Sequence, residues 1–369
     1  MAGRETVPII LMTVVFLLLM AAAGAFLLLR PTEPGSVATG GGEHPPPRGA
    51  GPTGNPTLDT IDRLTVQIDA GPARPDGYLS RGHAYIRLGD YEAATADYTK
   101  AIDLGAPAEA AHHARAIARQ AIGDYDAALA DYDRVLEINP DHANAVLARG
   151  RLHKAMGHFE AAAADLARAL PLNAHLADIA HELGWAQWGI DDYEGALESF
   201  NQAIRGRRVT AHDYFARGAT HYHLDQFETA QADLRRAVGI RGDGRAYAHL
   251  YLWLATTRVG ERAEADRVLR GYLETAGEMT VGQWWPRLAA FLLGDLSEAE
   301  LLDEAAQGNW QPAPEQMCEA YFYAGSARLI EGDAATAADY FQRSVETNVQ
   351  NFYEYFSAKR ELARLRGEH

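Results

Sequence analysis

Small and aromatic side chains recur every 34 residues through the middle of this chain, between residues 75 and 244. In each unit a small residue is followed nine positions later by an aromatic residue, and three positions after that by alanine. The small residues are Gly82, Ala116, Gly150, Gly184 and Gly218. The aromatic residues are Tyr91, Tyr125, Phe159, Tyr193 and Phe227, and the alanines are Ala94, Ala128, Ala162, Ala196 and Ala230. Five units in one register predict a stack of similar structural modules.

Each unit has the pattern of two short helices joined by a tight turn. Gly89 stands where the first helix ends, and Asp90 follows as a candidate N-cap of the second helix. Ala94 lies one turn after Tyr91 on the same helical face, where a larger side chain would push the two helices apart. This period and these residues resemble the tetratricopeptide repeat, or TPR. The resemblance implies an all-α superhelical solenoid in which each repeat buries its apolar face against its neighbours.

The helical pattern continues on both sides of the regular units. Residues 59–74 predict a capping helix, and residues 75–244 hold the five regular TPR units. Residues 245–314 predict degenerate helical pairs, and residues 315–369 predict a C-terminal TPR-like unit with a final capping helix. The predicted fold is thus an all-α TPR solenoid of five regular and several degenerate repeats, preceded by one N-terminal transmembrane helix.

The N-terminal segment contains an uninterrupted, uncharged run. Residues 1–6 form a short tail, and residues 7–29 are long enough to span a hydrocarbon core as a helix. Residues 30–58, which are rich in Pro, Gly and Thr, predict a disordered tether. A cleaved signal peptide is the competing interpretation of the apolar run. We expect a single-pass inner-membrane protein whose TPR domain lies in the periplasm, with a domain facing the cytoplasm as the alternative.

Composition narrows the function classes. The formal net charge of −16 argues against electrostatic binding of nucleic acid. The single cysteine, Cys318, excludes an internal disulfide and predicts a buried small side chain. The sequence has no phosphate-binding glycine loop, zinc-protease motif or nucleophile elbow. We therefore expect no enzymatic activity, no cofactor and no metal. The scattered histidines and the acidic residues of the second helices, such as Asp97, Asp131 and Asp165, are interpreted as solvated.

The surface that remains for function is the groove of a TPR stack, which the first helix of each unit lines. Counting from the small residue, the residues predicted to face inward include His83, Arg87, His113, Gln120, Asn144, Leu147, Arg151, Lys154, His181, Trp185, Trp188, His212, Phe215, Tyr222 and His223. Aromatic side chains commonly anchor interfaces, and basic side chains can receive an acidic group of a partner. The predicted partner-binding residues are Arg151, Lys154, His181, Trp185, Trp188, Phe215 and Tyr222. The competing interpretation is that the aromatic side chains only fill space between adjacent helices.

The C-terminal stretch carries a second resemblance. Several matches are similar to the C-terminal segment of NlpI-type bacterial TPR lipoproteins: residues 318–325, residues 331–333 with Ala337, Phe341 and Val345, and residues 348–355. This resemblance implies an envelope adaptor that dimerises and brings peptidoglycan hydrolases to a protease or to partner enzymes. The chain lacks the lipid-carrying cysteine of that family after its apolar run, which implies an inner-membrane anchor in place of outer-membrane attachment.

The sequence therefore predicts a membrane-anchored scaffold that mediates protein–protein interactions in the bacterial cell envelope. Its expected partners are one or more envelope proteins bound in the groove, and a homodimer is left open. Recruitment of peptidoglycan hydrolases or proteases and assistance to complex assembly both fit the pattern. The alternative from another class is a ligand-binding or enzymatic module that uses residues 276–314, with Trp284, Trp285 and Trp310 forming a pocket.

Overall fold

The structure is a computed structural model that describes residues 54–172, 176–206, 209–240, 245–276, 283–350 and 352–368. Within these ranges the regular structure consists of α-helices and one short 3-10 helix, without strands. The chain divides into two compact units, Met1–Asn139 and Pro140–His369. The all-α, TPR-like helical solenoid predicted from the sequence is confirmed for this part of the chain.

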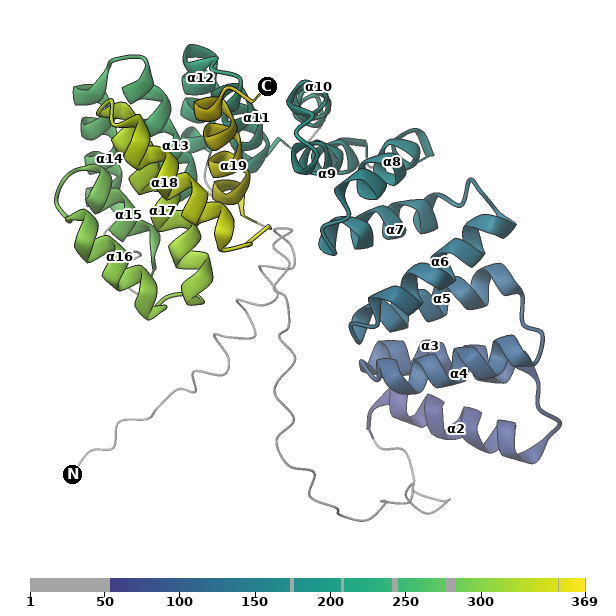
Figure 1. The fold of residues 1–369 in the computed structure, drawn as a ribbon. Helices are drawn as coiled ribbons and strands as arrows, with labels where there is room; N and C mark the ends of the chain where they lie inside the picture. Colours follow the sequence, from purple (N-terminus) through teal and green to yellow (C-terminus); the bar gives the residue numbers. More distant parts are fainter. Residues whose placement is uncertain are drawn as a thin grey trace, which may run out of the picture. The chain divides into compact units, whose positions relative to one another are not determined.

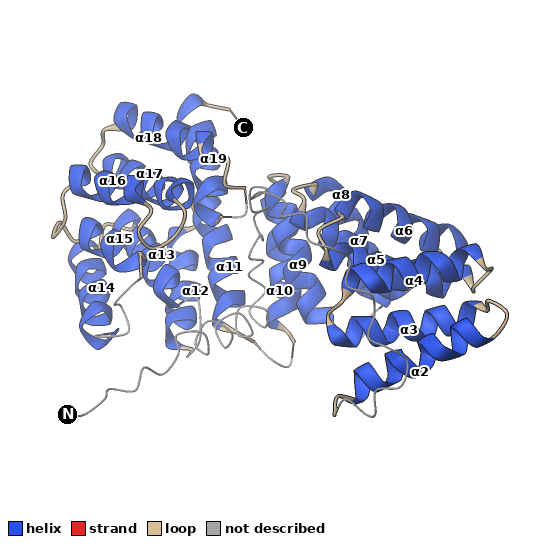
Figure 2. Ribbon diagram, turned by 90° about the horizontal axis from the view of Figure 1, so that it is seen from below, coloured by secondary structure: helices blue, strands red, loops and turns tan. Residues whose placement is uncertain are grey.

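The first unit stacks a capping helix and two TPR repeats (Figures 1 and 2). Its helices are α2 (Pro56–Ala70), α3 (Pro75–Leu88), α4 (Tyr91–Asp103), α5 (Ala108–Ala121) and α6 (Tyr125–Ile138). Helix α2 begins at Pro56 because the side chain of Asn55 accepts a hydrogen bond from the Thr57 backbone N–H. It therefore takes in the last residues of the predicted tether.

The second unit begins with three more regular repeats and continues into the degenerate C-terminal helices. The regular repeats contain α7 (Ala143–Ala155), α8 (Phe159–Ala169), the 3-10 helix η1 (Leu170–Leu172), α9 (Leu176–Gly189), α10 (Tyr193–Ile204), α11 (Ala211–His223) and α12 (Phe227–Gly239). The remaining helices are α13 (Arg245–Arg258), α14 (Arg262–Ala276), α15 (Trp285–Leu292), α16 (Glu298–Gln307), α17 (Ala313–Ile330), α18 (Ala334–Glu346) and α19 (Tyr353–Arg366). We number the repeats 1 to 5 by their first helices, α3, α5, α7, α9 and α11.

The small residue of each repeat lets its first helix touch the second. A Cβ atom added to Gly82 would stand 2.7 Å from a ring carbon of Tyr98, and one added to Gly184 would stand 2.5 Å from a ring carbon of Phe200. These distances are shorter than van der Waals contact, so the backbone at these positions leaves no room for a side chain. The five alanines of the pattern are fully buried against the same joint. The 34-residue pattern thus arises because the two helices of each repeat approach each other closely at these positions.

A buried ion pair also repeats inside the regular units. The residue before the small residue is arginine in four of the five repeats, and its guanidinium donates two hydrogen bonds to an aspartate on the second helix. Arg81 donates to the two carboxylate oxygens of Asp97 at 2.8 and 2.7 Å, and to Thr65 Oγ1 of α2 at 3.0 Å. The equivalent pairs are Arg115–Asp131, Arg149–Asp165 and Arg217–Asp233, with nitrogen–oxygen distances of 2.6–2.9 Å. Each pair joins the two helices of one repeat.

The prediction that the acidic residues of the second helices are solvated is wrong for this set. Asp97, Asp131 and Asp165 are buried. They can be buried because the arginine supplies both a countercharge and hydrogen bonds. For Asp131, burial by itself would raise the pKa, but the hydrogen bonds from Arg115 and His112 outweigh it and lower the pKa.

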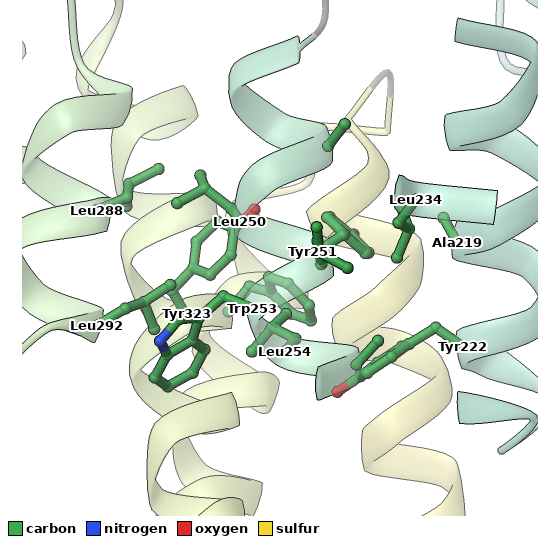
Figure 3. Close-up of a cluster of buried hydrophobic side chains, with 14 of the residues drawn as sticks. Ala219, Tyr222, Leu234, Leu250, Tyr251, Trp253, Leu254, Leu288, Leu292 and Tyr323 are labelled. Atoms are coloured by element: carbon green, nitrogen blue, oxygen red, sulfur yellow. The ribbon is translucent and has the colours of Figure 1, made fainter. Parts of the chain in front are cut away.

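A hydrophobic core surrounds α13 in the second unit (Figure 3). Trp253 of α13 is buried among side chains from several helices, which include Leu288 and Leu292 of α15 and Tyr323 of α17. The predicted burial of Cys318 on α17 is confirmed. Because these helices meet around α13, residues far apart in the sequence share one core.

Two tryptophans of the alternative pocket belong to the same core. Trp284 and Trp285 are buried, and the ring of Trp285 stacks on Tyr272 with centroids 5.1 Å apart. Trp284 lies 5.5 Å from the half-buried Trp310. These contacts give the aromatic side chains of residues 283–310 a packing role.

The predicted membrane-spanning segment is not among the described helices. Among the described helices, none is both long and apolar enough to cross a membrane. The predicted tail (1–6), span (7–29) and most of the tether (30–58) lie outside the described residues. Anchoring through residues 7–29 stays a prediction.

We expect Asp131→Asn to destabilise the first unit strongly. Asp131 receives hydrogen bonds from Arg115, Arg119 and His112, and its replacement leaves buried cations without a countercharge. Breaking a buried ion pair from one side costs about 3–5 kcal/mol. Urea unfolding followed by far-UV circular dichroism measures the loss.

The matched control is Arg134→Gln, which breaks an exposed ion pair with Glu137 and is expected to cost about 0.5 kcal/mol or less. Equal effects of the two substitutions would contradict the role of the buried pair.

Candidate partner-binding site

The side chains that can face a partner follow from the position of the small residue in each first helix. The residue three before it and the residues one, four and five after it share one face, because an α-helix turns by about 100° per residue. We call this set the first-helix face. Its members are Leu79, His83, Ile86 and Arg87 in repeat 1; His113, Ile117, Gln120 and Ala121 in repeat 2; Leu147, Arg151, Lys154 and Ala155 in repeat 3; His181, Trp185, Trp188 and Gly189 in repeat 4; and Phe215, Ala219, Tyr222 and His223 in repeat 5.

The first-helix face differs in exposure between the early and late repeats. In repeats 1 to 3 its residues are exposed or half-buried, and Ile117 leaves 42% of its surface exposed although it is apolar. In repeats 4 and 5 the face is largely aromatic and mostly covered. Its buried members there are Trp188, Phe215, Ala219, Tyr222 and His223.

Helix α19 covers part of the face of repeats 4 and 5, where it lies beside α11 (Figures 1 and 2). Tyr353, in its first turn, makes the central contact. The Tyr353 ring centroid lies 4.1 Å from that of Trp185 and 4.8 Å from that of Phe215. Its hydroxyl lies 2.7 Å from Nε2 of His212. The C-terminal helix therefore occupies the place that the sequence assigned to a partner.

The next turn of α19 continues this contact. Ser357 Oγ lies 2.9 Å from Nε2 of His223 and 2.7 Å from the hydroxyl of Tyr251. The Phe356 ring lies edge-on to Phe159 of α8, with centroids 5.5 Å apart. Helix α19 thus contacts side chains from several helices of the second unit.

The remainder of α19 is held by an ion pair between Glu361 and Arg258 of α13 and by two more with the ends of first helices. Lys359 Nζ lies 2.7 Å from Asp191 Oδ2, and Arg364 Nη1 lies 2.6 Å from Asp225 Oδ1. Both aspartates are the second residue after a first helix of the stack, Asp191 after α9 and Asp225 after α11. Both pairs are partly exposed, so they lie at the rim of the joint.

The two predicted basic residues already have an acidic neighbour. Arg151 and Lys154 lie 2.7 and 3.2 Å from the carboxylate of Glu182 on α9. Burial by itself would raise the pKa of Glu182, but the charges of Lys154 and Arg151 outweigh it and lower the pKa. An acidic group of a partner would therefore compete with Glu182 for these cations.

The other predicted groove residues also contact the chain itself. Trp185 donates from Nε1 to Nε2 of His181 at 2.9 Å, and Nδ1 of His181 lies 2.9 Å from Asp213 Oδ1. Trp188 donates from Nε1 to Thr220 Oγ1 at 2.8 Å. Phe215 lies under Tyr353 and Tyr222 packs on Phe227. Partner binding by the seven residues stays a prediction, and for the buried aromatic members it requires α19 to leave.

The expectation that the histidines are solvated is wrong for several of them. His223 and His249 are buried. Burial lowers the pKa of His212 and of His223 to about 3, and that of His249 to about 4. These side chains are neutral at physiological pH, and His212 and His223 act as hydrogen-bonding groups between helices.

The sequence interpretation treated α19 only as a cap and missed Tyr353, Ser357, Lys359 and Arg364 as contact residues. A terminal cap needs one apolar face. Helix α19 has apolar side chains on two opposite sides, with Phe356 beside Tyr353 on one and Leu362 on the other. That two-sided pattern is the signal that predicts burial between two surfaces.

Helix α19 also brings a buried carboxyl close to a second one. Glu354 and Glu319 of α17 each leave 1% of their surface exposed. The Tyr323 hydroxyl donates to Glu354 Oε1 at 3.1 Å, and Gln311 Nε2 donates to Glu319 Oε2 at 2.7 Å. Burial raises the pKa of Glu354 to about 7. Burial and the neighbouring Glu354 raise the pKa of Glu319 well above its usual range.

We expect ionisation of Glu354 to destabilise the second unit as the pH rises from 6 to 8, against the opposite effect of the buried His212, His223 and His249, whose lowered pKa values add stability over the same range. The folded-state pKa of Glu354 is raised, so its contribution is fully present below the unfolded pKa and disappears as the pH passes through about 7. The expected loss is roughly 1 kcal/mol from this group. Urea unfolding followed by tryptophan fluorescence reports it, because all six tryptophans lie in this unit.

Glu354→Gln should remove the contribution of this carboxyl, because glutamine is neutral throughout the range, so its stability relative to wild type should rise by roughly 1 kcal/mol between pH 6 and 8. Glu346→Gln is the matched control, since it makes the same change at an exposed site on α18 and should keep the wild-type slope. A Glu354→Gln slope equal to that of wild type would contradict the assignment to Glu354.

Comparison with known proteins agrees with the helix pairs. Two models of the tetratricopeptide repeat match the chain, over residues 75–104 and residues 120–181. A lipoprotein NlpI homolog from Haemophilus influenzae is 27% identical over 179 residues, which make up 48% of this chain and 55% of that protein. The chain thus spans about half the length of this relative.

Solved structures with similar helical stacks include a crystal structure of MamA protein, with 23% identity and a TM-score of 0.44 over 46% of this chain and 92% of that one. Another is a tetratricopeptide repeat protein from Parabacteroides merdae, with 12% identity and a TM-score of 0.49 over 79% of this chain and 98% of that one. Neither score carries an argument about function. Two segments of the chain thus match tetratricopeptide-repeat models, and the helix pairs of the described residues have the form that those models predict.

Proposed function

We propose that this protein is a non-enzymatic scaffold of the bacterial cell envelope that holds protein partners on its first-helix face. Tetratricopeptide repeats mediate protein–protein interactions, because stacked helix pairs present an extended surface. The observation that carries the proposal is the open first-helix face of the early repeats, where exposed Ile117 lies among polar and basic positions.

The face in the first unit offers mixed chemistry to a partner segment. Ile117 of α5 supplies an apolar contact, while His83 and Arg87 of α3 are exposed polar positions. Second helices orient two polar groups of this face: the His83 ring lies edge-on to Tyr98, and Gln120 of α5 accepts a hydrogen bond from the Tyr132 hydroxyl at 3.1 Å. An apolar contact flanked by oriented polar groups is typical of a peptide-binding surface.

The groove predicted in the second unit forms part of the proposal. Its seven residues are Arg151, Lys154, His181, Trp185, Trp188, Phe215 and Tyr222. Arg151 remains partly exposed beside Glu182, whereas Trp185 and Phe215, which contact Tyr353, become available only when α19 moves. Envelope partners such as peptidoglycan hydrolases or proteases follow from the NlpI resemblance, as does a homodimer, and both are proposals for this chain.

Attachment to the inner membrane through residues 7–29 is also proposed. The apolar run is long enough to span a bilayer, and the residues from 30 up to the start of α2 at Pro56 would then act as a tether. A tethered scaffold raises the local concentration of the protein that it holds. A reporter enzyme that is active only outside the cytoplasm, fused after His369, is expected to be active. An inactive fusion that is produced intact would favour the cytoplasmic alternative.

Site-specific photo-crosslinking in intact cells tests the binding face. We expect a photoreactive residue at Ile117 to capture a discrete partner, and the same residue at exposed Ala130 on α6 to capture none. His83→Glu with Arg87→Glu should reduce capture at Ile117 about tenfold or more, because it changes the chemistry of the face without entering the core. Equal capture at Ile117 and Ala130 would place partner binding on another surface.

A further inference from the structure

One position of the repeat changes chemistry where α19 docks. Seven residues after the small residue, repeats 1 to 3 have glycine with a left-handed backbone: Gly89, Gly123 and Gly157, with φ of 84°, 80° and 77°. Repeats 4 and 5 have Asp191 and Asp225 there, and these keep the left-handed backbone with φ of 62° and 56°. Aspartate adopts this conformation less readily than glycine does. The chain therefore holds local strain at two equivalent positions.

The two strained aspartates both pair with α19, and Asp225 also lies 3.7 Å from Arg258 of α13. Asp191 accepts a hydrogen bond from Lys359, and Asp225 accepts one from Arg364. The two aspartates lie one repeat apart in the stack, and the two basic residues lie five residues apart on α19. Their side chains remain 45% and 49% exposed, so burial in a core does not account for them. Strained residues concentrate where a ligand is clamped. The pair acts as an acidic clamp for a basic helix.

The joint between α19 and repeats 4 and 5 is polar for a contact inside one chain. His223 Nδ1 on α11 and Arg360 Nε on α19 are buried without a hydrogen-bond partner in the described part of the structure. Such groups regain water when the surfaces separate, which lowers the cost of opening. By contrast, α17 and α18 meet through Phe341 over Gly325, as in a regular repeat. The α19 joint resembles a non-obligate interface with two aromatic anchors, Tyr353 and Phe356, and a charged rim.

From these observations we infer that the first-helix face of repeats 4 and 5, with its clamp of Asp191 and Asp225, is a receptor for a basic amphipathic helix, and that α19 is a ligand of this kind carried by the chain itself. The inference rests on the proposed function, in which the first-helix face binds proteins, and names the partner class for this part of it. The partner is a helix of another protein that displaces α19.

The contacts of α19 specify the chemistry of that partner. It has an aromatic residue with a hydroxyl in its first turn, like Tyr353 against Trp185 and His212. Basic side chains follow about two and three turns later, to reach the two aspartates. An acidic helix is rejected, because its carboxylates would face the clamp.

The probe for the test is a fluorescent synthetic peptide of residues 349–369, and binding to the full chain is followed by fluorescence anisotropy. In the wild-type chain α19 competes for the face, so binding should be weak. Lys359→Glu with Arg364→Gln in the chain weakens its own helix, and this variant should bind the peptide at least tenfold more tightly. Adding Asp191→Gly and Asp225→Gly should reverse that gain, because it removes the clamp and leaves the backbone that glycine adopts in repeats 1 to 3.

Two controls keep the result interpretable. Arg366→Glu changes an exposed basic residue of α19 that faces Gln342 of α18, so this chain should bind the peptide like wild type. Tryptophan fluorescence confirms that each variant keeps the second unit folded. If the double variant of α19 is unfolded, Lys359→Glu alone is used, because it breaks only the exposed pair with Asp191.

The inference is overturned if weakening α19 leaves peptide affinity unchanged, or if removing both aspartates does not weaken binding. It is also overturned if wild-type chain sediments as a dimer that Asp191→Gly with Asp225→Gly converts to a monomer, since the occupant is then a second copy. The peptide test uses repeats 4 and 5 and needs no cellular partner. Its failure is therefore distinct from a failure of crosslinking at Ile117.

Discussion

Everything else in this molecule depends on the close approach of the two helices within each repeat. At Gly82 and Gly184 the backbone of the first helix lies against an aromatic ring of the second, where no further carbon fits. That contact sets the geometry of the helix pair, and the stack repeats it. It also decides which residues of each first helix point away from the pair. Helix packing within each repeat therefore determines which residues form the first-helix face.

The Arg–Asp pairs add a second constraint on the same joint. A bidentate guanidinium–carboxylate pair is directional, so it orients the helices as well as holding them together. The pair is absent from repeat 4, where Leu183 and Ser199 take its two positions and Ser199 donates to Gln187 instead. That repeat is also where the face becomes aromatic and receives Tyr353. The regular stack and the surface that binds α19 thus meet in one repeat.

How far sequence reasoning reached is clear from particular residues. Local contacts within 34 residues impose the helix pairs, the left-handed Gly89 and the side-chain cap of Asp90, so the sequence predicts all three. The buried state of Asp131 was not recognised, although the 34-residue spacing of its arginine partner carried the signal. Asp191 and Asp225 carried a similar signal, since they replace a glycine that the earlier repeats keep. An analysis of the apolar positions alone does not detect these repeated polar residues.

The sequence by itself determined the repeat, the helix pairs and the face of each first helix that points away from its partner helix, because periodic local contacts dictate all three. Only the tertiary structure decided which part of that outward face is open. Helix α19 lies more than 100 residues from α11 in the chain, and its docking depends on how the degenerate helices turn around α13. No local pattern encodes that turn, since it is the sum of many helix–helix angles. Trp185 and Phe215 could therefore be placed on the first-helix face from sequence, while the helix that covers them could not.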